Sequence, residues 1–155
     1  MPNIKLTKHD GDHISLPSAS IRAIFSCALT GKTDGRLSVV IADYRGESVH
    51  ILGQTARSVR DAVDADRKTK KGLLVFKGKP KPWVALACGP DDDSFFEPGT
   101  LVGHEGVRYP LVENGEPVER LRVQYRRHTG VVSNEDVEMT EANMATIDAD
   151  IEGDH

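Results

Sequence analysis

The chain has little of what usually reveals a function or a compartment. It contains only two cysteines in 155 residues, Cys27 and Cys88, and both lie in apolar runs, which favours buried thiols over a disulfide framework. No apolar run approaches the roughly 18 residues that span a bilayer. The first residues also lack the apolar core of a signal peptide. We therefore expect a soluble, cytoplasmic protein without a membrane partner.

Motifs of catalysis and cofactor binding are missing as well. The sequence has no Gly-x-Ser-x-Gly element, no Walker A sequence and no Gly-x-Gly-x-x-Gly loop. The segment 9–13, His-Asp-Gly-Asp-His, has zinc-ligand residue types, but consecutive turn residues rarely aim their side chains at one point, so it predicts a polar turn. Residues 91–93, three aspartates, depart from the calcium-loop pattern and predict a solvated loop. We expect no metal, no cofactor and no enzymatic activity.

Charge, in contrast, is strongly sorted along the chain. Residues 129–155 contain eight acidic side chains and no Lys or Arg, so the first 128 residues hold all 20 basic side chains and carry about +4. Four apolar residues of this segment have the spacing of one face of a helix, which the segment could form when it docks on a partner surface: Met139, Met144, Ile147 and Ile151. The acidic content without basic partners nevertheless favours a disordered tail over 132–155 that competes with ligands or recruits a protein partner.

The body is predicted to be mainly β with one short helix. Strict alternation marks a strand at 120–126, and Ala56, Val59 and Val63 recur at helical spacing in a helix near 55–66 that Thr55 can cap. The order of elements fits a small twisted sheet or an OB-like, partly open barrel. We expect a β-rich body at 1–90, an added β-hairpin subdomain packed on it at 91–131, and the acidic tail.

Two basic segments are the best candidates for a binding surface. Residues 67–81 contain seven basic side chains and no acid, and basic residues alternate on the outward face of 120–126. Such side chains neutralise phosphates, and aromatic rings stack on exposed bases. Solvated strand edges explain the lysines equally well. The residues predicted to contact nucleic acid are Lys68, Lys70, Lys71, Lys77, Lys79, Lys81, Trp83, Arg120, Arg122, Tyr125 and Arg126.

Two classes of function fit these patterns. The first is a non-enzymatic accessory module that binds the backbone of nucleic acid through the basic surface, with the acidic tail competing or recruiting partners. The second is a protein-interaction or assembly subunit that uses exposed strand edges and the acidic tail, and that forms homo-oligomers. The modest charge of the body favours the second class, whereas the clustering of lysines favours the first. Salt separates them, because only phosphate contacts weaken steeply as salt rises.

Overall fold

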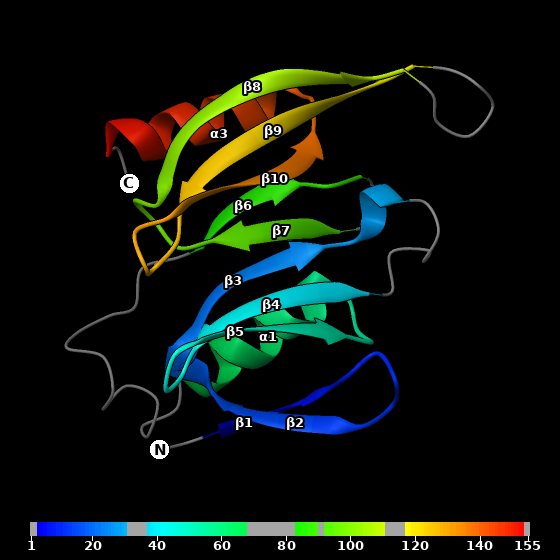
Figure 1. Ribbon diagram of the computed structural model, residues 1–155, viewed down its shortest axis with the longest axis vertical. Coiled ribbons are helices and arrows are strands. Elements are labelled where there is room, and N and C mark those ends of the chain that lie inside the picture. Colours follow the sequence, from blue (N-terminus) through cyan, green and yellow to red (C-terminus); the bar gives the residue numbers. More distant parts are fainter. Residues whose placement is uncertain (1–2, 31–36, 68–82, 90–91, 111–116, 154–155) are drawn as a thin grey trace.

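The protein folds mainly as antiparallel β-sheet, as the sequence predicts (Figure 1). The computed structural model describes residues 3–30, 37–67, 83–89, 92–110 and 117–153. In these ranges the strands form three separate sheets, of five, three and two strands, and none of the three closes into a barrel. The prediction of a mainly β fold is therefore confirmed, and these ranges contain no closed barrel.

The five-stranded sheet is the centre of the molecule. Its strand order is β5-β4-β3-β7-β6, and every neighbouring pair is antiparallel. The predicted domain boundary at residue 90 falls between two of its adjacent strands. The strands are β3 (Ile21–Ser26), β4 (Ser38–Asp43), β5 (Glu47–Leu52), β6 (Val84–Ala87) and β7 (Asp93–Phe96).

One face of this sheet is sealed by α1 (Ala56–Arg67) and by the hairpin of β1 (Asn3–Thr7) and β2 (His13–Pro17). Val59 and Val63 of α1 are fully buried there against Phe95, which confirms the predicted helix and its apolar stripe. Figure 1 shows α1 behind β3, β4 and β5. Burial of large apolar side chains from three elements makes this face a conventional hydrophobic core.

The start of α1 is held by two residues. Thr55 Oγ1 accepts a hydrogen bond from the backbone N–H of Ser58 at 3.2 Å, which is the predicted cap. The carboxylate of Asp92 accepts from the N–H groups of Ala56 and Arg57 at 3.1 and 3.0 Å. Asp92 is buried, so the interpretation of 91–93 as a solvated loop is wrong at this position. A carboxylate at a helix N-terminus satisfies free N–H groups and favours the helix dipole.

The opposite face packs against the three-stranded sheet and α3 (Glu141–Glu152). This sheet has the order β10-β9-β8, and its inward side chains Leu121, Val123 and Val137 join Leu86 and Phe96 in a second core. Figure 1 shows α3 beside β8 at one end of the molecule. The strands are β8 (Leu101–Tyr109), β9 (Val118–Arg126) and β10 (Val132–Glu138).

The prediction of a disordered acidic tail is wrong for residues 132–152. β10 pairs with β9 along seven residues, and Ile147 on α3 is fully buried. Thr140 caps the start of α3, because its side chain accepts a hydrogen bond from the N–H of Asn143. Gly153 caps the end of the helix in the left-handed conformation (φ 77°).

The acidic side chains in this region find partners that lie far away in the sequence. Asp136 pairs with Arg122 on β9, and Glu138 accepts a hydrogen bond from the N–H of Gly89. Asp150 is buried and accepts from the N–H groups of Gly99 and Leu101 at 2.6 and 3.0 Å. The local sequence shows only unbalanced charge, because these donors come from other elements.

Neither α-helix of the described residues is long and apolar enough to cross a membrane. Both have 12 residues, whereas a spanning helix needs roughly 20.

Candidate functional site

Of the predicted nucleic-acid contacts in the first basic segment, only Trp83 can be placed. The six lysines between 68 and 81 lie outside the described residues. The indole Nε1 of Trp83 donates to Asp64 at 3.0 Å, and the guanidinium of Arg67 lies 5.0 Å from the centre of the ring. Arg67 also donates to the backbone carbonyls of Ser18 and Ile21. The two residues that flank the lysine-rich segment are thus in contact with each other.

The outward arginines of β9 are mostly engaged within their own sheet. Arg122 pairs with Asp136 at 3.5 Å and with Glu105 at 4.0 Å. It also donates to the hydroxyl of Tyr109, and this hydrogen bond, followed by the charge of Asp136, raises the pKa of Arg122. Arg120 donates to the carbonyl of Glu119. This face of the three-stranded sheet therefore alternates basic and acidic groups.

Tyr125 does not have the exposed ring that base stacking requires. Its side chain is 6% exposed, and its ring centre lies 5.3 Å from that of Phe25 and 5.4 Å from that of Phe96. Desolvation, together with the nearby charge of Glu135, raises the pKa of Tyr125 to about 12. Predicting Tyr125 as a stacking group was wrong, because the strict alternation of β9 turns it inward with Leu121 and Val123.

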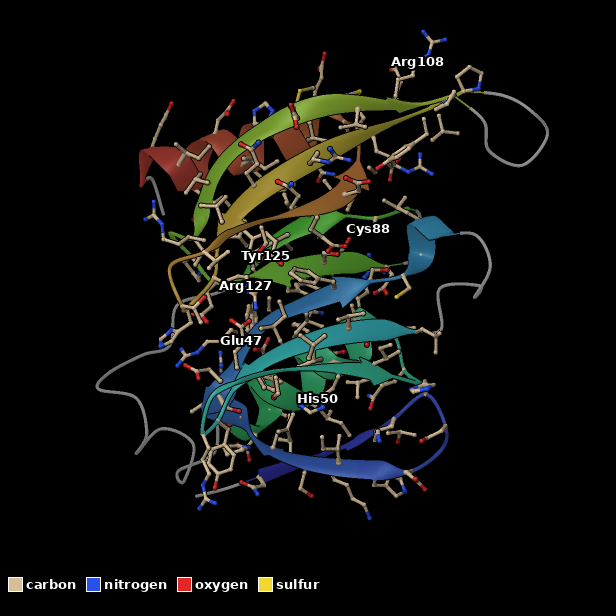
Figure 2. All side chains as sticks on the ribbon, viewed as in Figure 1. Glu47, His50, Cys88, Arg108, Tyr125 and Arg127 are labelled. Carbon is tan, nitrogen blue, oxygen red and sulfur yellow. The ribbon has the colours of Figure 1, made fainter. Side chains whose placement is uncertain are left out.

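A pocket of about 160 Å³ opens where the β9–β10 turn approaches the central sheet. Its floor is apolar and comes from β3, β4, β7 and β9, while its rim is charged. Figure 2 shows Arg127 from this turn near Glu47 of β5, with Tyr125 close by. The lining residues are Arg22, Ala23, Ile41, Phe96, Glu97, Gly99, Thr100, Tyr125, Arg126, Arg127 and His128.

The rim is held in place by ion pairs and by α3. Arg127 pairs with Glu47, and His128 Nε2 lies 3.0 Å from Asp43. On the other side, Asp150 binds the N–H of Gly99, where the chain turns with φ 82°. A left-handed conformation of this kind suits glycine. The pocket is therefore formed by elements that the fold fixes from two directions.

An apolar strip runs from this pocket across β4 and β5. Val49 pairs with Ile41, and Ile51 pairs with Val39, so these four side chains share one face of the sheet. Ile41 lines the pocket and is buried, whereas Val49 is 58% and Ile51 46% exposed. No described element is drawn in front of β4 and β5 in Figure 1. We call Val39, Val49 and Ile51 the open strip.

A third group of side chains lies inside the second core. Burial, and next the charge of Asp136, raises the pKa of Glu135 to about 7. Burial also raises the pKa of Cys88 to about 12, with smaller effects from Ser94 and Glu135. A thiol with so high a pKa stays protonated at neutral pH and is a poor nucleophile. Cys88 is a buried thiol, as predicted, whereas Cys27 is only partly buried.

No family model, curated protein or solved structure matches this chain. The candidate site therefore stands on the geometry of its own residues. Of the residues that line the pocket, only Tyr125 and Arg126 are among those predicted from the sequence to contact nucleic acid. The sequence does not identify Arg22, Glu97 or the open strip as parts of a site. No local pattern reveals where β3, β4, β5 and the end of β7 lie relative to β9.

Proposed function

We propose that this protein is a non-enzymatic protein-interaction module that binds its partner on the open strip. The observation that carries the proposal is that Val49 and Ile51 are exposed on the same sheet face as a charged pocket. Single exposed apolar residues are common, but an apolar strip beside a pocket that has polar groups on its rim is typical of binding surfaces.

The partner is expected on the face of the sheet and not along its edges. The amide of Asn143 bonds both the N–H and the carbonyl of Ala87, which closes the β6 edge at that point. At the β5 edge, the N–H of His9 donates to Ile51 and the carbonyl of Thr7 accepts from Gly53. Groups bonded in this way are not free to pair with an added strand.

The test is selection of a peptide library displayed on phage against the purified protein, followed by binding of the selected peptides in solution. Ile51→Ser should weaken their binding at least tenfold, because it removes an apolar contact from the open strip. Ile151→Ser is a matched control, since Ile151 on α3 is 43% exposed and Ile51 is 46% exposed. Equal binding to both variants would contradict the proposal.

Nucleic-acid binding is a second candidate, favoured by one observation. The flanking residues Arg67 and Trp83 are in contact, and six lysines lie between them in the sequence. Positive charge clustered in the sequence in this way attracts phosphate groups. Fluorescence anisotropy of labelled oligonucleotides across a salt series tests this function. Replacing Lys70, Lys71, Lys79 and Lys81 by Ala should weaken binding and flatten its salt dependence. Unchanged affinity would remove this candidate.

A further inference from the structure

The pocket beside the open strip has a net positive lining. Three guanidinium groups, from Arg22, Arg126 and Arg127, lie on its rim with His128, while Glu97 is the one carboxylate among the lining residues. Asp43 and Glu47 stand outside the lining and pair with His128 and Arg127. Charge of this sign at the mouth of a pocket attracts an anionic group.

Two of these guanidiniums retain hydrogen-bonding capacity. Arg22 lies 3.6 Å from Glu97 and 4.0 Å from Asp43, beyond ordinary hydrogen-bond length. Its Nε is buried and has no hydrogen-bond partner among the described residues. Arg126 is exposed, and no described residue forms an ion pair with its guanidinium. The exposed guanidinium of Arg126 is available to an oxyanion, which an arginine fork binds through two parallel hydrogen bonds. Arg22, whose Nε is buried, adds positive charge to the lining.

The volume of the pocket and its apolar floor restrict the class of ligand that it can bind. At about 160 Å³ the pocket is smaller than the 300–1,000 Å³ of typical cofactor sites, so it accommodates a single side chain and not a nucleotide. The floor of Ala23, Ile41 and Phe96 is apolar and suits a hydrocarbon stem. A carboxylate on an aliphatic stem fits these conditions better than a phosphate.

We propose that the pocket binds a carboxylate of the partner, either an Asp or Glu side chain or a C-terminal carboxyl group. This inference rests on the proposed protein-interaction function and specifies its partner: an acidic peptide segment whose apolar residues lie on the open strip. Ile41 belongs to the pocket floor and pairs with Val49, so one segment a few residues long contacts both. The acid sets the register of the segment, and the strip binds the residues next to it.

The direct test is a titration of the full chain with N-acetyl-leucine, followed by amide chemical shifts in NMR. The amide signals of Gly99, Thr100 and His128 should move with a single saturation curve. N-acetyl-leucinamide, which has the same stem without the charge, should bind at least tenfold more weakly. Inorganic phosphate should also bind more weakly than N-acetyl-leucine. Equal affinity for the acid and the amide, or tighter binding of phosphate, would overturn the assignment of a carboxylate.

Two arginine variants test where the ligand binds, and neither of them changes a residue of the hydrophobic core. Arg126→Gln should weaken binding of N-acetyl-leucine at least fivefold, because Arg126 is exposed and lines the pocket. Arg120→Gln is the matched control on the same strand, outside the pocket lining, and should change the affinity less than twofold. Equal losses in both variants would show a general effect of charge and would overturn the site.

The two proposals fail in different ways. If selected peptides depend on Ile51 but tolerate replacement of their acid by the neutral amide residue, the protein-interaction function stands and the carboxylate pocket fails. If N-acetyl-leucine binds as described but no selected peptide depends on Ile51, the pocket stands and the function proposed for the strip fails. Both proposals are supported if the selected peptides lose at least tenfold in affinity on Ile51→Ser, and also when their acidic residue is replaced by the neutral amide residue.

Discussion

The two faces of the central sheet bury their apolar side chains to different extents. On one face, α1 and the β1–β2 hairpin cover Phe95, Val40 and Leu52, all of which are fully buried. On the other face, the three-stranded sheet covers the apolar residues only as far as Ile41, and Val49 and Ile51 remain exposed. The sealed face has the form of a core whose function is stability. The open face combines an apolar strip with a charged pocket, which a core does not require.

The largest contrast between the faces should appear in stability. Phe95→Ala removes a fully buried ring from the sealed face and should lower the free energy of unfolding by about 3–5 kcal/mol. Ile51→Ser changes a half-exposed residue of the open face and should cost less than about 0.5 kcal/mol. Denaturant unfolding followed by circular dichroism measures both. Similar costs for the two variants would contradict the distinction between the faces.

A smaller but more informative effect is expected at Asp150, which links α3 to the pocket. Asp150→Ala leaves the N–H groups of Gly99 and Leu101 without their acceptor and should cost about 2–3 kcal/mol of unfolding free energy. Asp148→Ala, which changes an exposed carboxylate on the same helix, serves as the control and should cost less than about 1 kcal/mol. Because Gly99 lines the pocket, the Asp150 variant should also bind N-acetyl-leucine more weakly.

The smallest of these effects depends on pH and concerns Glu135 on β10. Its pKa rises on folding from 4.5 to about 7, so the folded protein binds an extra proton between these values. Its contribution to stability is therefore greatest below pH 4.5 and is lost as the pH rises through 7. Glu135→Gln should raise the unfolding free energy at pH 8 by about 1–3 kcal/mol, and by much less at pH 4.5.

The control for Glu135 is Glu105→Gln, at a carboxylate that is 55% exposed. It should change stability by less than about 0.5 kcal/mol at either pH. Equal changes at both pH values for the Glu135 variant would show that burial of this carboxyl group is not the cause.

The sequence predicts those parts of the fold that depend on local periodicity. The helix near 55–66 appears as α1, and the alternation of 120–126 appears inside β9. Both patterns arise within a few residues, because each element turns one face to a core. The prediction of a single helix was incomplete, because α3 is a second helix.

Contacts between distant segments could not be predicted in the same way. The acidic residues of 132–152 suggest disorder when they are read alone, yet Asp136 and Asp150 find donors on β9 and at the β7–β8 turn. The pocket itself joins residues 22 and 128, which only the tertiary fold brings together.

The most direct test of the account is to map where a selected acidic peptide binds by amide chemical shifts. We expect the largest changes on β4, β5 and residues 99–100 and 126–128, with little change on α1 or the β1–β2 hairpin. That result would establish the open face as the binding surface. Changes concentrated on α1 and the hairpin, with β4 and β5 unaffected, would contradict it.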